Sequence, residues 1–217
     1  MSPSTQMRAA YKILILISAT VALHSTAQVI TYNTFGEPGD TYTNGSGWLV
    51  NGSANPPQPY VGEAFAFTPS VSGTLSRVSL VLSAGNTNLA SDLANVVISD
   101  NSPGNLPNAR LETFSNVACS GPFGANNPLT SLTAATRPFL QAGNTYWLSV
   151  EPATSTADVI VNQNSLGLLA SQAQEFSRFN WIARGNKTTF AFSVEVVPEP
   201  SILALAALGI FGFVRRR

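Results

Sequence analysis

Apolar and polar residues alternate along much of the chain between residues 28 and 196. The segments 77–83 and 189–196 show this pattern most clearly, because aliphatic or aromatic side chains return at every second position. A period of two is typical of a β-strand that turns one face toward a core and the other toward water. Gly, Pro and Asn gather between the alternating segments and supply turns. The pattern therefore predicts an all-β domain.

The expected strands are short and are spaced as in a fold of two packed sheets. They cover residues 29–35, 48–50, 64–68, 75–83, 96–99, 110–114, 145–151, 159–162, 177–183 and 189–196. Helical periodicity is scarce, and the segment 165–174 is the one candidate for a short helix. We therefore expect residues 28–196 to form a single jelly-roll-like β-sandwich domain.

The first residues have the features of an export signal. Arg8 and Lys12 precede a mostly apolar run at 13–23, and a site of small residues follows at 25–27. A basic region, a short apolar core and such a site are typical of a secretory signal peptide. We expect cleavage after Ala27, so that residues 1–27 direct the rest of the chain out of the cytoplasm. The alternative, a buried N-terminal helix, would have to begin in a polar segment.

The last residues join a proline-rich motif, an apolar run and a basic end. In order, these are Val197, Pro198, Glu199 and Pro200, then residues 202–214, then Arg215, Arg216 and Arg217. Proline cannot donate to a β-ladder, so the motif predicts an exposed, extended hinge after the last strand. A helix over 202–214 would cover about 20 Å of a hydrocarbon core of about 30 Å.

We expect this apolar run to be a short transmembrane helix. The arginines at its end favour the cytoplasmic side, and they can reach the headgroups while the bilayer thins locally. Together with export directed by the signal peptide, this arrangement places residues 28–196 on the outer side of the membrane. The alternative, a terminal helix packed on the domain, leaves the three arginines unexplained.

The order of motif, apolar helix and arginine cluster resembles the PEP-CTERM sorting signal of Gram-negative bacteria. The resemblance covers residues 197–217. It implies that an exosortase, a membrane transpeptidase-like enzyme, recognises the Pro-Glu-Pro motif and processes a precursor held in the inner membrane. It also implies delivery to the cell surface or extracellular matrix and an association with biofilm and extracellular polysaccharide.

The region between the two signals is similar to the choice-of-anchor R family. The similarity rests on Gly-Ser-Gly-Trp at 45–48, Asp-Asn-Ser-Pro-Gly-Asn-Leu-Pro at 100–107 and Leu-Gln-Ala-Gly-Asn-Thr-Tyr-Trp-Leu at 140–148. Domains of this family are bacterial surface modules found with different C-terminal anchors, including PEP-CTERM. The resemblance carries no established activity to this chain.

Charge and composition exclude several classes of function. The 217 residues include 11 Lys and Arg against 11 Asp and Glu, so no basic surface suits nucleic acid. With one cysteine and one histidine, a disulfide within the chain and a zinc site of Cys and His ligands are excluded. Because His24 lies in the expected signal peptide, residues 28–196 contain no Ser-His-Asp or Cys-His pair. We expect Cys119 to be a buried or loop residue, and we expect neither an enzyme nor a cofactor.

Carboxylates leave one catalytic alternative open. A glycoside hydrolase needs two of them facing each other across a cleft, and this sequence alone does not pair its acidic residues. Asp100, Asn101 and Asn105 offer oxygen ligands for Ca²⁺, but Asp and Asn also stabilise turns through their own backbone. We favour the turn and expect no metal site.

The tryptophans bear on a possible polysaccharide partner, because an exposed indole face can stack on a sugar ring. In 145–151, Trp147 alternates with the apolar side chains, so it is the best candidate for an exposed, glycan-binding residue. Even for Trp147 we favour packing over contact with a sugar, because large aromatic residues are mostly buried. We expect Trp48 and Trp181 in the core. The function expected is a structural or adhesive component of the polysaccharide matrix. The alternatives are a carbohydrate-active hydrolase with two carboxylates and a purely structural surface-layer subunit.

Overall fold

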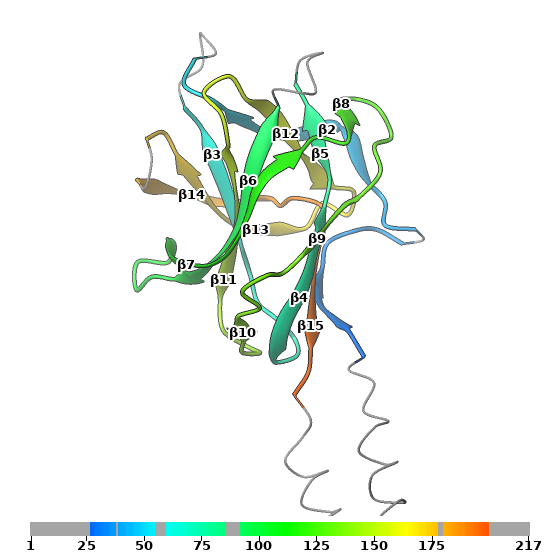
Figure 1. The fold of residues 1–217 in the computed structure, drawn as a ribbon, viewed down its shortest axis with the longest axis vertical. Coiled ribbons are helices and arrows are strands. Elements are labelled where there is room, and N and C mark those ends of the chain that lie inside the picture. The colour runs from blue at the N-terminus through cyan, green and yellow to red at the C-terminus, as the bar shows by residue number, and fades with distance from the viewer. Residues whose placement is uncertain (1–26, 38, 55–59, 86–91, 178–179, 200–217) are drawn as a thin grey trace, which may run out of the picture.

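The computed structural model describes residues 27–37, 39–54, 60–85, 92–177 and 180–199. These residues form β-strands and turns. Among them, no helix is long and apolar enough to cross a membrane. The expected all-β class is therefore confirmed (Figure 1). The expected signal peptide up to residue 26, Pro200, the apolar run 202–214 and the terminal arginines lie outside the described residues.

The strands are short, and most are joined by turns. They are β1 (Val29–Asn33), β2 (Tyr42–Asn51), β3 (Gly62–Phe67), β4 (Gly73–Leu80), β5 (Leu82–Ala84), β6 (Leu93–Asn101), β7 (Pro107–Ala118), β8 (Gly121–Pro122), β9 (Thr130–Thr133), β10 (Phe139–Leu140), β11 (Tyr146–Pro152), β12 (Asp158–Asn164), β13 (Leu169–Glu175), β14 (Trp181–Thr188) and β15 (Phe192–Val197).

The strands are arranged in three sheets. A six-stranded sheet has the order β14-β13-β3-β11-β6-β7, and a four-stranded sheet has the order β2-β12-β5-β8. The five-stranded sheet follows β1-β15-β4-β10, with β9 also paired to β4. Neighbouring strands are antiparallel except β5 and β8, which are parallel. Figure 1 shows the six-stranded sheet on one side and the other two sheets on the opposite side, as a β-sandwich requires.

The core lies where these sheets face each other. Phe65 and Phe67 on β3 point toward Phe190, which precedes β15, and Phe192, the first residue of β15, and all four are almost completely buried. The ring centres of Phe65 and Phe190 are 4.7 Å apart, edge to face, and those of Tyr32 and Phe192 are 5.0 Å apart. Burial of these rings supplies much of the driving force for folding. The alternation expected in 189–196 is confirmed, because Val194 and Val196 continue the buried face.

The expected helix at 165–174 is wrong. After a turn, this segment becomes β13, which pairs with β14 on one side and with β3 on the other. Asn164 shapes the turn, because its Oδ1 accepts hydrogen bonds from the backbone N–H groups of Leu166 and Leu168. Leucines on the exposed turn produce the apparent helical spacing, whereas the strand itself is held by its neighbours.

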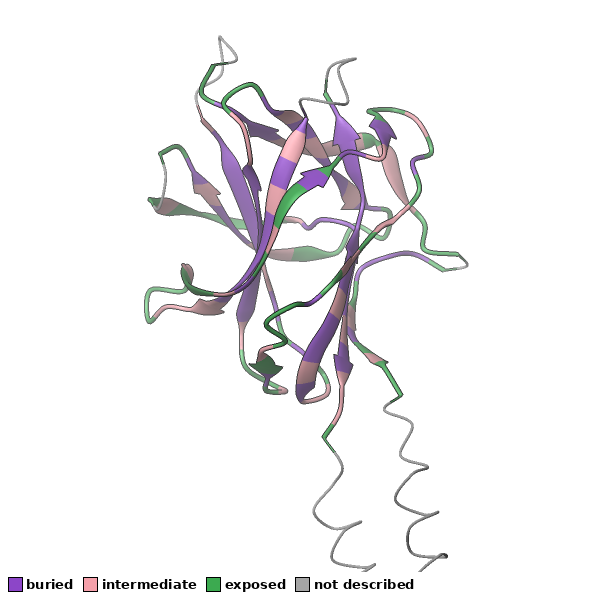
Figure 2. Cartoon of the chain, viewed as in Figure 1, coloured by how far each residue is buried: buried purple, intermediate pink, exposed green. Residues whose placement is uncertain are grey.

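The strand expected at 177–183 begins later than its sequence pattern indicates. Ser177 belongs to a turn in which its carbonyl accepts from Asn180 N, and β14 starts at Trp181. Figure 2 shows that β14 is largely exposed, as expected of a strand at the edge of a sheet. The segment 45–47, expected as part of a connection, lies inside β2. The short strands β9 and β10 were not expected from the sequence.

Candidate functional site

The two ends of the described chain lie side by side. Val29 on β1 pairs with Val196 on β15, so Gln28 and Pro198 leave the domain at the same end of the five-stranded sheet (Figure 1). Ala27, Gln28 and Glu199 are exposed. The expected signal cleavage site and the described part of the proline motif are therefore both on the surface, next to each other.

β15 leads directly into the proline motif. Val197 still pairs with Thr74 on β4, and the strand ends there because Pro198 has no N–H to donate. β15 runs between β1 and β4, and its Val194 and Val196 are fully buried. The motif thus follows a strand that is held on both sides by neighbouring strands. The predicted end of this strand, residue 196, is confirmed to within one residue.

A second candidate site lies on the outer face of the six-stranded sheet, the face turned away from the main core. Glu175 on β13 pairs with Gly62 on β3, and Glu151 on β11 lies on the other side of Gly62. A Cβ atom at Gly62 would lie 3.5 Å from Cβ of Glu175 and 3.6 Å from Cγ of Glu151. The glycine therefore leaves room for two carboxylate side chains to flank one strand.

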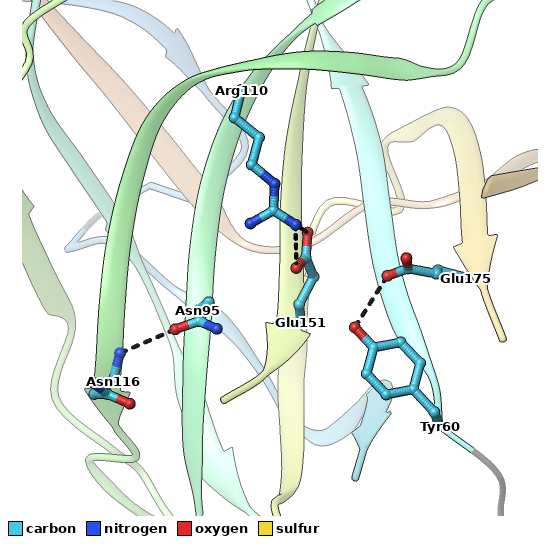
Figure 3. Close-up of polar contacts among 6 residues, drawn as sticks. All are labelled: Tyr60, Asn95, Arg110, Asn116, Glu151 and Glu175. Atoms are coloured by element: carbon cyan, nitrogen blue, oxygen red, sulfur yellow. Dashed lines mark hydrogen bonds and ion pairs between the residues drawn. The ribbon is translucent and has the colours of Figure 1, made fainter. Parts of the chain in front are cut away.

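Both carboxylates have partners. Nη2 of Arg110 on β7 lies 2.8 Å from Oε1 and 2.6 Å from Oε2 of Glu151, and the Tyr60 hydroxyl donates to Oε2 of Glu175 over 3.1 Å (Figure 3). Glu151 is 6% exposed and Glu175 is 1% exposed. Charged partners and hydrogen bonds offset the cost of burying these groups. The arrangement is an ordered polar layer beneath the surface.

Trp147 lies on this outer face, as its strand parity predicts, and it is packed there, which is the role that we favoured over contact with a sugar. Only 1% of the residue is accessible, and its indole Nε1 donates to Oδ1 of Asn101 over 2.8 Å. Leu106 and Trp181 pack against the cluster that Trp147 forms with Ala64 and Ala173. The outer face is covered here, so the indole has no free face for a sugar ring.

The other two tryptophans lie at the edges of buried clusters. Trp48 packs against the main core, and its indole Nε1 donates to the backbone carbonyl of Thr188 over 2.8 Å. Trp181 packs on the cluster around Trp147. Both are partly buried, which agrees with the expected packing role in part.

Glu63 lies on the opposite face of β3 from the paired carboxylates and was not singled out by the sequence. It is 1% exposed, and the side-chain amides of Gln172 and Gln174 donate to its two oxygens over 2.8 Å and 2.6 Å. Burial raises the pKa of Glu63 to about 7, although both amides and the positive charge of Arg184 act to lower it. Two glutamines spaced by two residues were the only signal in the sequence for this site.

Cys119 is buried, as expected. Burial, followed by the negative charges of Asp92 and Asp158, raises the pKa of its thiol to about 12. A thiol of this kind is a poor nucleophile at neutral pH.

Asp100 and Asn101 are the last residues of β6, and a turn follows them over residues 102–106. The backbone N–H of Asn105 donates to the carbonyl of Ser102, and Asn105 adopts a φ of 54°. In the part of the chain that the structure describes, no group of three or more His, Cys, Asp or Glu side chains is placed to hold a metal ion.

Comparison with known proteins identifies one end of the chain. Residues 196–217 match the PEP-CTERM protein-sorting motif. The match begins in the last two residues of β15, and it supports an exported protein that an exosortase-type enzyme sorts at the membrane. The motif also supports a membrane-anchored precursor that is sorted to the cell surface. No curated protein matches the chain.

Proposed function

We propose that the folded body is a non-enzymatic structural or adhesive component of the extracellular polysaccharide matrix, delivered there through its sorting motif. The observation that carries this proposal is the junction between β15 and the motif. Because the motif begins where the sheet ends, processing within or beyond it leaves the whole sandwich intact as cargo. The similarity of the body to choice-of-anchor R surface modules belongs to the same proposal.

The state of the acidic residues supports a non-enzymatic role. Glu151 and Glu175 are almost fully buried and already bound to Arg110 and Tyr60. A general acid or nucleophile must reach the glycosidic bond of its substrate. Carboxylates held in this way suit the support of a sheet better than attack on a polymer.

Fractionation of cells tests the sorting step. Wild-type protein should reach the surface or medium, whereas a Pro198→Ala/Glu199→Ala/Pro200→Ala variant should stay in the membrane fraction at its precursor size. Pro103→Ala/Pro128→Ala is a matched control, because both prolines are exposed and lie in connections between strands away from the motif. An unchanged distribution of the triple variant would remove the sorting argument.

The matrix role is tested by pull-down on polysaccharide purified from the producing cells. Exported wild-type protein should be retained on this polymer and released by the soluble polymer as competitor. An exported protein that binds no matrix polymer would contradict the adhesive role while leaving the sorting step standing.

A carbohydrate-active hydrolase is the second candidate, and the two carboxylates that flank Gly62 are the observation in its favour. Incubation of the matrix polymer with the protein should release no new reducing ends if the first proposal holds. Release that disappears in both Glu151→Gln and Glu175→Gln, but persists in Glu63→Gln, would establish the hydrolase instead.

A further inference from the structure

Two large apolar side chains are exposed at the end of the domain where the termini leave. Ile30 on β1 is 54% exposed and Phe139 on β10 is 49% exposed. These strands are the two ends of the path β1-β15-β4-β10, so three strand spacings, about 14 Å, separate the two residues across the sheet, and Ile30 is offset by two residues along the strands. Val197 lies between them, because Val197 and Phe139 both pair with Thr74. We call Ile30, Phe139 and Val197 the terminal apolar rim.

This rim is close to the point where the chain would enter a membrane. Residues 198–201 separate the end of β15 from the apolar run 202–214. Five extended steps from Val197 to Ile202 span at most about 17 Å. When the apolar run is embedded in lipid, the rim therefore cannot be far from the bilayer surface.

The charges described around the rim are balanced. Arg77 lies 3.7 Å from Glu195 and donates a hydrogen bond to the side chain of Gln28. Arg137 and Glu199 are both exposed. Attraction of this end to anionic lipid is therefore weak, and any contact with a bilayer rests on the apolar side chains.

We propose that in the membrane-anchored precursor the terminal apolar rim rests on the bilayer, with Ile30 and Phe139 at the level of the lipid headgroups. This inference rests on the membrane-anchored state in the proposed function. The partner is the lipid surface itself. Another group of exposed apolar side chains is Leu166, Leu168 and Leu169. The carbonyl of Leu168 accepts a hydrogen bond from the backbone N–H of Thr189, which precedes β15, so this group lies away from the end of β15 where the chain leaves the domain. Because residues 198–201 form only a short connection to the apolar run, this contact fixes which end of the domain faces the bilayer.

This orientation turns the polar layer around Glu151 away from the membrane. At one end of β11, the Tyr146 hydroxyl accepts a hydrogen bond from the backbone N–H of Gln141, next to β10 and the rim. Glu151 lies near the other end of the same strand. The sheet end that carries Glu151 thus projects toward the cell exterior.

Site-specific fluorescence quenching on the full chain tests the proposal. The chain is reconstituted into phosphatidylcholine vesicles that contain a headgroup-attached quencher, and one dye is placed by Phe139→Cys or Ile30→Cys. Ile182→Cys is the matched control, because Ile182 is also on a strand, is 44% exposed and belongs to the edge of the other sheet. Wild-type protein serves as the labelling blank, since Cys119 is buried.

The expected result is several-fold stronger quenching at positions 139 and 30 than at 182, with little change on adding salt or anionic lipid. Equal quenching at the three positions, in protein that resists a carbonate wash, would overturn the proposed orientation. Protein that the wash removes from the vesicles would overturn it too. Removal by the wash would contradict the membrane-anchored state itself, whereas equal quenching in anchored protein would contradict only the contact of the rim with the bilayer.

Discussion

The pKa values of two buried glutamates in the six-stranded sheet shift in opposite directions. Glu63 on β3 and Glu112 on β7 are 1% and 3% exposed. Burial acts to raise both pKa values, and for Glu63 it prevails and brings the pKa to about 7. In Glu112 the hydrogen bonds to the carboxylate outweigh burial, and its pKa is lowered.

The difference lies in the donors. Glu63 accepts hydrogen bonds from two side-chain amides. Glu112 accepts hydrogen bonds from the Thr136 hydroxyl and from the backbone N–H groups of Thr136, Arg137 and Thr113. Backbone donors that the fold has already fixed stabilise an anion at little further entropic cost. Glu112 thereby fastens the segment before β10 to β7, while Glu63 is a group that takes up a proton near neutral pH.

The largest expected effect is the loss of stability as Glu63 ionises. Its pKa in the folded state is above the ordinary value of 4.5, so the folded protein binds this proton more tightly than the unfolded chain does. The contribution is fully present below pH 4.5 and is lost as pH rises through about 7. A shift of this size corresponds to a change on the order of 3 kcal/mol.

Urea unfolding of wild type and Glu63→Gln between pH 4 and 8 checks this prediction, with tryptophan fluorescence as the signal. The variant should lose most of the decline that wild type shows between pH 4.5 and 8. Glu195→Gln is a control at a partly exposed site and should keep it. Parallel curves for wild type and Glu63→Gln would contradict the role of Glu63.

Removal of the Glu112 carboxylate should have the next largest effect. Glu112→Ala leaves the backbone N–H groups of Thr136 and Arg137 without their acceptor, while the Thr136 hydroxyl keeps the carbonyl of Leu111, and we expect a cost of about 2 kcal/mol in the free energy of unfolding. Urea unfolding at pH 7 measures it. Because the pKa of Glu112 is lowered, this stabilisation is present above the ordinary pKa and fades as pH falls through the folded value. A smaller loss in Glu112→Ala at acidic pH than at pH 7 is therefore expected.

The third prediction concerns Arg110, which forms an ion pair with Glu151. Arg110→Gln leaves the Glu151 carboxylate largely buried without its ion pair, and we expect a loss of about 1 kcal/mol, limited because the Arg110 side chain is 35% exposed. Unfolding at low and high salt measures this loss. Glu151→Gln combined with Arg110→Gln should recover part of it, because no unpaired charge then stays buried. A double variant less stable than the sum of the single ones would refute this account.

The sequence predicted the parts of the fold in which one strand face is apolar. Val194 and Val196 alternate with Ser193 and Glu195, and the two sets lie on opposite faces of β15. β13 escaped prediction because Gln172 and Gln174 occupy an inward face that a simple pattern reserves for apolar residues. These glutamines bind Glu63, and only tertiary pairing brings the two segments together.

Of the candidate sites, the sequence predicted the proline motif but not the polar layer. The proline motif was readable because its residues are adjacent in sequence and proline acts on its own backbone. The polar layer was not, since Arg110, Glu151 and Glu175 come from separate strands that the fold assembles. For Trp147 parity gave the correct face, but Leu106 and Trp181, which cover it, belong to other elements. Parity assigns a face, and exposure depends on what packs over that face.

The smallest expected effect concerns an ion pair at the surface. Arg77 and Glu195 are 3.7 Å apart on neighbouring strands of the five-stranded sheet, and the Arg77 side chain is 40% exposed. Water and salt screen such a pair, and holding two long side chains together costs entropy, so Arg77→Gln should change the free energy of unfolding by at most about 0.5 kcal/mol. Urea unfolding at low and high salt should separate this small effect from that of Arg110→Gln. A loss at Arg77 as large as the loss at Arg110 would mean that burial of the carboxylate is not what distinguishes the two pairs.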